Sequence, residues 1–179
     1  MGELYNPQAF ALTNYRPKHL IPDIEIGTIA DISIAELKER GIKGVVLDVD
    51  NTLGPYGCKE VHPILKLGLK EMRWHFRTML LSNTTPERLK TLEGYFGIPA
   101  LASDHKKPDP WVYKEIEALW ELQPEQLAAF GDRLSTDIAG ANRAGWTSIK
   151  VDPFDVKSEP KAVRVARVLE NFLLAFYRE

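Results

Sequence analysis

The sequence predicts a Rossmann-like α/β fold in which helices cover both faces of a parallel sheet. Short apolar segments rich in β-branched residues alternate with helix-like segments from residue 32 to the C-terminus, and this alternation is typical of βαβ units. Polar residues follow several of the apolar segments, at the points where strands of such a sheet would end. The 179 residues are 44% hydrophobic and 27% charged, which fits one globular domain.

The regular elements begin with a helix. Ser33 and Glu36 form a capping-box pattern at the start of this helix, and Gly41 is expected to end it. Strand and helix then alternate, as the crossover connections of a parallel sheet require. The elements expected after residue 41 are strands at 44–48, 77–82, 100–103, 127–132 and 147–151, and helices at 63–75, 86–95, 110–121, 135–144 and 161–177.

Residues 1–30 are rich in proline and lack periodicity, and we expect them to form an arm packed on a single domain of residues 31–179. The first 20 residues lack the apolar core of a secretory signal, and no segment approaches the roughly 18 apolar residues of a membrane span. The single cysteine, Cys58, excludes an internal disulfide and fits a reducing compartment. We therefore expect a cytoplasmic protein, and the net charge of -2 gives no support to a nucleic-acid partner.

Acidic, hydroxyl and basic residues follow four of the expected strands. In a parallel sheet the strand ends lie along one edge, where ligands bind near a topological switch point. Burying paired carboxylates there is costly unless a cation or hydrogen bonds compensate. The set contains what phosphoryl transfer to a carboxylate requires, including oxygen ligands for Mg²⁺. The residues are Asp48, Asp50 and Thr52 after the first strand, Ser82 and Asn83 after the second, Lys106 and Lys107 after the third, and Asp132 and Asp137 after the fourth.

Each of these motifs alone has a structural explanation. Gly131 and Asp132 with a later acid are typical of a helix cap, and residues 82–86 of a helix start. A Ca²⁺ loop is excluded, because Thr52 and Leu53 stand where such a loop needs an oxygen ligand and a glycine. The order of the motifs, each at a predicted strand end, favours one functional site over separate structural roles.

In order, these residues resemble the four motifs of the haloacid dehalogenase-type (HAD) phosphatases. Residues 31–43 and 137–142 are similar to subfamily IIIA of this superfamily, in particular to the YqeG-type phosphatases and the phosphatidylglycerophosphate phosphatases. The alternating pattern extends the resemblance over residues 44–151 and implies a hydrolase of phosphoric monoesters. The matching positions are Asp48-x-Asp50-x-Thr52, Ser82, Lys107-Pro108 and Gly131-Asp132-x-x-x-x-Asp137.

The resemblance implies a role for each residue of the site. Asp48 is expected to be the nucleophile that becomes a phosphoaspartate. Asp50 is expected to protonate the leaving oxygen and then to activate water. Mg²⁺ is expected to bind Asp48, the backbone carbonyl of Asp50 and the side chain of Asp132, while Ser82 holds the transferred phosphoryl group.

A lysine and three supporting residues complete the implied site. Lys107 is preferred to Lys106 because the family places its lysine directly before proline. Asp137 is expected beside the metal, either through water or through a hydrogen bond to Lys107. Thr52 and Asn83 are expected to support the site from the same loops.

No cap domain fits between the motifs. The intervals from Asp48 to Ser82 and from Ser82 to Lys107 are each filled by one helix, one strand and short loops. An open site suits a large or membrane-anchored phosphomonoester that provides its own cover, and the resemblance implies phosphatidylglycerophosphate. A phosphoprotein phosphatase, a soluble-metabolite phosphatase and a non-catalytic phospho-switch module stay open as alternatives, as does an oligomer that lends a cap in trans.

Two terminal segments bear on membrane contact. The helix at 161–177 is apolar along much of its length, and its start is basic. Such a helix either lies on an anionic membrane surface or packs on the sheet as the last crossover helix. Residues 14–22 mix basic and apolar side chains and leave the same choice between lipid contact and a docked arm. The basic residues at the start of the helix are Lys157, Lys161, Arg164 and Arg167.

Overall fold

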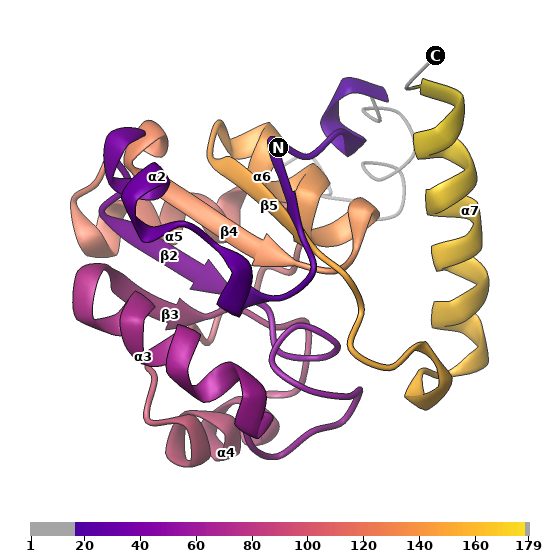
Figure 1. The fold of residues 1–179 in the computed structure, drawn as a ribbon, viewed down its shortest axis with the longest axis horizontal. Coiled ribbons are helices and arrows are strands. Elements are labelled where there is room, and N and C mark those ends of the chain that lie inside the picture. The colour runs from indigo at the N-terminus through magenta and orange to yellow at the C-terminus, as the bar shows by residue number, and fades with distance from the viewer. Residues whose placement is uncertain (1–16, 178–179) are drawn as a thin grey trace, which may run out of the picture.

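The sheet has five parallel strands. The computed structural model describes residues 17–177 (Figure 1). The parallel sheet and the helices around it confirm the predicted α/β fold. The strands are β1 (Ile24–Ile26), β2 (Gly44–Leu47), β3 (Arg77–Leu80), β4 (Leu127–Gly131) and β5 (Thr147–Val151), and they pair in the order β1-β5-β4-β2-β3.

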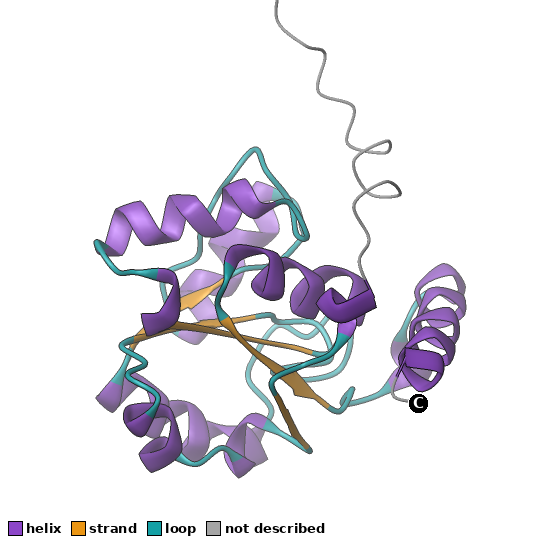
Figure 2. Cartoon of the chain, turned by 90° about the horizontal axis from the view of Figure 1, so that it is seen from above, coloured by secondary structure: helices purple, strands orange, loops and turns teal. Residues whose placement is uncertain are grey.

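Helices cover both faces of this sheet (Figure 2). Ser33, Thr85 and Asp109 each accept a backbone N–H at the start of α2, α4 and α5, which satisfies donors that a helix start leaves free. The α-helices within the described residues are α2 (Ile34–Glu39), α3 (Lys66–His75), α4 (Pro86–Phe96), α5 (Pro110–Trp120), α6 (Ala139–Ala144) and α7 (Lys161–Tyr177). Shorter turns are η1 (Pro17–Leu20), η2 (Ile29–Asp31), η3 (Pro63–Leu65), η4 (Pro124–Gln126), η5 (a π-helix, Leu134–Ile138) and η6 (Val156–Ser158).

The alternation of side chains along the central strands builds two cores. Val45 and Leu47 of β2 are buried with apolar residues of α2, α3 and α4. Val46 points to the opposite face and is buried with residues of α5 and α6. All four residues of β2 are buried, as expected for a central strand of a doubly covered sheet.

The central strand β2 lies at the switch point of the sheet. The chain passes from β2 to β3 on one side and later returns to β4 on the other side of β2. The carboxyl ends of β2 and β4 therefore flank the crevice where open α/β sheets bind ligands. Between these two strands, residues 48–126 form α3, β3, α4, α5 and short connections without an inserted domain, as predicted.

The predicted strand at 100–103 is wrong. Only a single bridge forms there, between Leu80 and Ala100. Ser103 explains why pairing stops, because its hydroxyl accepts the backbone N–H of His105 and donates to Glu115. These side-chain hydrogen bonds turn the backbone away from the sheet.

The segment before residue 31 contributes a strand that was not predicted from the sequence. β1 pairs in parallel with β5, with Ile24 opposite Ile149, and Asp23 fixes the start of the strand by accepting the N–H of Ser148 at 2.8 Å. Residues 1–16 of the expected arm lie outside the described residues. We therefore propose that the domain begins before Ile24 rather than at residue 31.

Helix α7 stands beside the sheet rather than on it (Figure 1). Its main contacts are with η1 and η5, and its Leu174 joins a small third core that includes Leu20 and Ile138. The alternative in which this helix covers the sheet is therefore wrong. No helix within residues 17–177 has the length and apolar character to span a bilayer.

Candidate active site

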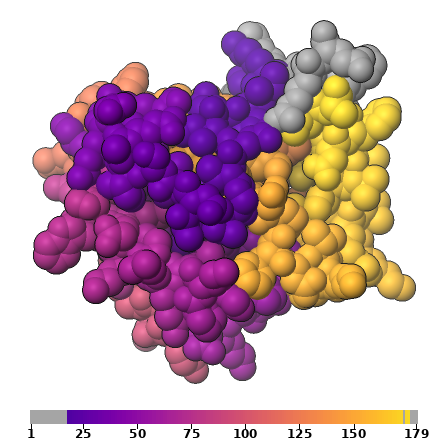
Figure 3. Space-filling view, in the orientation of Figure 1, coloured from indigo at the N-terminus to yellow at the C-terminus, as the bar shows by residue number. Residues whose placement is uncertain are grey.

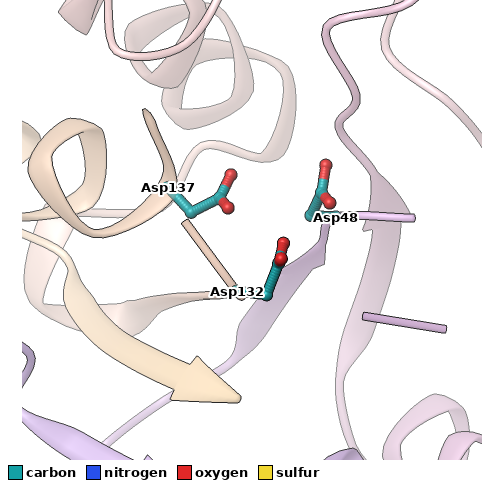
Figure 4. Close-up of side chains that lie close together, drawn as sticks. All are labelled: Asp48, Asp132 and Asp137. Atoms are coloured by element: carbon teal, nitrogen blue, oxygen red, sulfur yellow. The ribbon is translucent and has the colours of Figure 1, made fainter. Parts of the chain in front are cut away.

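Three carboxylates meet at the carboxyl ends of β2 and β4. Asp48 directly follows β2, Asp132 directly follows β4, and Asp137 lies in η5. One oxygen of each lies within 4.8 Å of the others, and Figure 4 shows the three side chains turned toward a common space. All three residues are buried, with exposed fractions of 8%, 2% and 3%.

Local backbone contacts bring these acids together. The N–H of Asp48 donates to the carbonyl of Phe130 at 2.9 Å, which ties the end of β2 to β4. Gly131 has no side chain, and a Cβ there would collide with Asp137, so only glycine allows this approach. The Oδ2 atom of Asp137 accepts the N–H of Arg133 at 3.0 Å. The turn after β4 therefore holds Asp137 over the strand end.

Lys107 is the cation between two of the acids. Its Nζ donates to Oδ1 of Asp48 and to Oδ1 of Asp137, at 2.6 Å each. Asn83 holds the lysine backbone, because its side-chain amide donates to the Lys107 carbonyl at 2.7 Å and accepts the Lys107 N–H at 2.9 Å. Lys107 is buried, whereas its neighbour Lys106 is exposed.

The cluster carries more negative than positive charge. Burial raises the pKa of Asp48 to about 8, and the neighbouring acids add to this although Lys107 opposes it. Burial and the charge of Asp137 likewise raise the pKa of Asp132 to about 6. Burial alone would lower the pKa of Lys107, but Asp137 and Asp48 outweigh it and raise that pKa. A further cation would offset the excess, and hard carboxylate oxygens are the donors that Mg²⁺ prefers.

The carboxylate of Asp50 lies away from this cluster, against α4. Arg88 donates to both of its oxygens at 2.7 Å, and the N–H of Gly57 donates to Oδ1 at 2.7 Å. Such a two-point contact holds a carboxylate firmly. The hydroxyl of Thr52 is buried and has no hydrogen-bond partner among the described residues.

Most of the predicted site residues line one cavity. A cavity of about 170 Å³ opens onto the cluster and is lined by Ser82 and residues of α7 as well as by the acids. The sequence-predicted residues that line it are Asp48, Asp50, Ser82, Asn83, Lys107 and Asp132. Thr52 and Asp137 are absent from this lining, although Asp137 contacts Lys107 from behind.

Sequence reasoning missed a group of charged residues that reaches the site from the C-terminal segment. Arg167 of α7 donates to the carbonyl of Asp132 at 3.0 Å and pairs with the carboxylates of both Asp132 and Glu159. Glu159 in turn accepts the side-chain amide of Asn51 at 2.7 Å. The sequence signal for this contact is weak, because Arg167 is one of several charged residues on the helix and was predicted only as part of its basic start.

A second buried pair joins α7 to the turn after β4. Glu170 accepts from the guanidinium of Arg133 at 2.6 Å and from the N–H of Leu134 at 3.3 Å, and it pairs with the hydroxyl of Ser135. Arg167 and Glu170 are each only 6% exposed. The inner side of α7 is therefore charged and forms one wall of the cavity.

The sequence matches the family model described as mitochondrial PGP phosphatase over residues 7–154. A protein of Bacillus subtilis named probable phosphatase YqeG is 31% identical over 159 residues, which cover 88% of this chain and 91% of that protein. A chloroplastic protein of Chlamydomonas reinhardtii named phosphatidylglycerophosphate phosphatase 1 is 35% identical over 93% of this chain. The match covers 65% of the Chlamydomonas protein, so this chain corresponds to less than two thirds of that relative.

Solved structures share the fold. A HAD-like family hydrolase from Porphyromonas gingivalis aligns with a TM-score of 0.53 at 16% identity, over 71% of this chain and 98% of that chain. The cobalt-bound form of the deoxy-D-mannose-octulosonate 8-phosphate phosphatase YrbI from Haemophilus influenzae aligns with a TM-score of 0.51 at 20% identity, over 77% and 90%. The HAD-type α/β architecture predicted from the sequence is thereby confirmed.

Proposed function

The chain belongs to the mitochondrial PGP phosphatase family, within the HAD superfamily of phosphoric monoester hydrolases, and on this premise we propose that it works through a phosphoaspartate on Asp48. The proposal is carried by the hydrogen bonding of the Asp48 carboxylate and by its position at the cavity. Asp48 Oδ1 accepts from Lys107, while Oδ2 has no hydrogen bond within the described residues and is left for attack on phosphorus. The side chain borders the cavity.

The first step forms the covalent intermediate. Oδ2 of Asp48 attacks the phosphorus, the bond to the ester oxygen breaks, and the leaving oxygen takes a proton from Asp50. Because Asp50 pairs with Arg88 in the structure, this role requires its carboxyl to turn away from α4 toward the cavity. Lys107 offsets negative charge on the phosphoryl oxygens, and Ser82 donates to one of them.

The second step releases phosphate. Asp50, now a carboxylate, takes a proton from a water molecule, whose oxygen attacks the phosphorus of the phosphoaspartate. The bond to Asp48 breaks, and inorganic phosphate leaves with Asp48 restored. Asp137 keeps Lys107 in place through its hydrogen bond, and Asn83 fixes the lysine backbone.

We also propose Mg²⁺ as the cofactor. Asp48, Asp132 and the backbone carbonyl of Asp50 would hold it, with Asp137 beside them. The excess negative charge and the all-oxygen donor set of the cluster support this, as does a cobalt-bound phosphatase among the solved proteins of this fold. When bound, the ion neutralises charge that builds up on the phosphoryl group.

The proposed substrate is phosphatidylglycerophosphate. The Chlamydomonas relative bears that activity in its name and is 35% identical to this chain over 176 aligned residues. The absence of an inserted cap in residues 48–126 leaves the cavity open to a substrate anchored elsewhere. The single cysteine fits a reducing compartment such as the cytoplasm, although the names of two plastid or mitochondrial relatives place those proteins in organelles.

The nucleophile is tested with Asp48→Asn. This variant should fold and lose turnover of p-nitrophenyl phosphate with Mg²⁺ by about 10³-fold or more, because the amide cannot attack. Asp104→Asn changes an exposed aspartate that does not line the cavity and should leave turnover unchanged. Full activity of the Asp48→Asn variant would contradict the proposed mechanism.

A substrate panel tests the rest. The wild-type enzyme should release phosphate faster from phosphatidylglycerophosphate than from a phosphopeptide or from sugar phosphates. Faster hydrolysis of the peptide or of the sugar phosphates would instead identify the substrate as a phosphoprotein or a soluble metabolite. A phosphoaspartate that persists without release of phosphate would identify a switch module instead.

A further inference from the structure

Helix α7 turns apolar side chains to the solvent and charged side chains to the domain, the opposite of an ordinary amphipathic helix of a globular protein. Its apolar residues Val165, Val168, Leu169 and Phe172 are exposed by 62%, 68%, 59% and 70%. Spacings of three and four place these four side chains on one side of the helix. A surface helix normally turns that side to the core, so this apolar stripe lacks a covering partner among the described residues 17–177.

The inner contacts of α7 fix the direction of the apolar stripe. Arg167 pairs with Asp132 and Glu159, and Glu170 pairs with Arg133. Turning the stripe inward would expose or unpair these buried charges, which is costly. The space-filling view shows α7, in yellow, along one side of the molecule (Figure 3). The outward position of the stripe is therefore built into the fold.

The charges around the stripe are basic. Lys157 and Lys161 are exposed at its start, and Arg164 is half-buried beside them. Glu170 is the only acidic residue of Lys161–Tyr177, and it is buried in its pair with Arg133. An apolar stripe with basic residues at one end complements the acyl boundary and anionic headgroups of a membrane.

The four side chains of the stripe alone provide less area than a stable dimer interface needs. Four aliphatic or aromatic side chains of this size bury on the order of 100 Å² each. A specific protein interface needs roughly 800 Å² from each partner. A bilayer has no such minimum, because each apolar side chain that enters it adds to the affinity independently.

We propose that the outer side of α7 docks the enzyme on an anionic lipid bilayer. Val163 and Arg167 line the cavity at Asp48 from the inner side of the same helix, so docking would hold the active site about 10 Å, one helix diameter, from the bilayer. This inference rests on the proposed lipid substrate for its purpose, but the docking itself is measurable without any substrate.

The test measures co-sedimentation of the full chain with vesicles of phosphatidylglycerol and phosphatidylcholine. The double variant Val168→Gln/Phe172→Gln should lower the vesicle-bound fraction about tenfold or more, because two apolar side chains leave the bilayer. It should hydrolyse p-nitrophenyl phosphate like the wild type, because neither residue lines the cavity. The matched control is Leu67→Gln/Leu119→Gln, which changes side chains exposed by 70% and 60% on α3 and α5 and should bind like the wild type.

The basic residues at the start of α7 provide a second test. Lys157→Gln/Lys161→Gln should weaken binding to the anionic vesicles, and binding of the wild type should fall as salt is raised. Vesicles of phosphatidylcholine alone should bind less protein. Equal vesicle binding by the wild type and by Val168→Gln/Phe172→Gln would overturn the proposal. Failure of the wild type to bind anionic vesicles would also overturn it.

Two further outcomes separate the alternatives. If light scattering shows a wild-type dimer that Val168→Gln/Phe172→Gln converts to a monomer, the stripe is an interface between two copies and the docking proposal is wrong. If the wild type binds vesicles but releases no phosphate from phosphatidylglycerophosphate, the substrate is wrong and the docking stands.

Discussion

Two cationic side chains offset part of the negative charge of the acidic cluster within the described part of the chain. Lys107 pairs with Asp48 and Asp137, and Arg167 pairs with Asp132. Only Lys107 belongs to the four motifs. At the scale of single residues, the charge balance of the site therefore depends on one residue that lies far along the chain from every motif.

Removal of the buried lysine should abolish activity, whereas removal of its neighbour should not. Lys107→Ala leaves Asp48 and Asp137 buried together without their shared ammonium, and it removes the charge that offsets the phosphoryl oxygens. Turnover of p-nitrophenyl phosphate should fall by about 10²- to 10³-fold. Lys106→Ala serves as the control, because this lysine is exposed and does not line the cavity. Similar losses in both variants would contradict the assignment.

At the scale of elements, two buried ion pairs attach the described part of α7 to the turn after β4. Its inner side holds Arg167 and Glu170, and its apolar contact with the small third core comes from Leu174. Ion pairs that are buried gain little over apolar packing, but loss of one partner is expensive, because the other charge stays without compensation. The attachment of α7 is therefore sensitive to single charge changes.

Glu170→Gln should destabilise the protein. The amide keeps the shape of the side chain but leaves the guanidinium of Arg133 without its counter-charge. We expect a loss of about 1–3 kcal/mol in the free energy of unfolding, measured in urea. Glu93→Gln changes an exposed glutamate of α4 and should stay within about 0.5 kcal/mol of the wild type. Equal effects of the two variants would show that the pair contributes nothing.

At the scale of the whole molecule, the acidic cluster joins separate parts of the chain. Asp48 follows β2, while Asp132 and Asp137 follow β4. A cation held by these residues would bind the folded state and not the unfolded chain. Its binding free energy would then add to the stability of the entire domain.

Mg²⁺ should therefore raise the melting temperature as well as the activity. At about 100 times its Kd the ion adds about 2.7 kcal/mol to the free energy of unfolding, which corresponds to a rise of roughly 5–10 °C for a domain of this size. Asp132→Asn should remove most of the rise, while Asp152→Asn, whose side chain is 72% exposed, should preserve it. EDTA should abolish turnover, and Mg²⁺ should restore it. An unchanged melting temperature in excess Mg²⁺ would contradict the proposed ion.

The features that the sequence predicted are those with local signals. A run of apolar residues followed by Asp48 marks both a buried strand and its end, and a capping residue such as Ser33 marks a helix start. Strand ends of a parallel sheet share one edge, so the grouping of the motif residues followed from the fold class alone.

The features that it missed depend on contacts distant in sequence. β1 has only three residues, with Ile24 and Ile26 on one side, and its pairing with β5 joins segments more than 100 residues apart. The segment at Ala100 stands where the alternating pattern predicts a strand, but Ser103 draws its backbone into a turn. The direction in which Arg167 points is decided by Asp132 and Glu159, not by the pattern of its own helix.

The chain from Asn51 through Glu159 and Arg167 to Asp132 has a consequence for protein engineering. A shortened protein that stops at residue 155 keeps all four motifs and all five strands. It nevertheless loses the partner of Asp132 and one wall of the cavity. The smallest unit that retains catalysis therefore extends into the C-terminal helix, and fusions or truncations should be placed beyond Leu174.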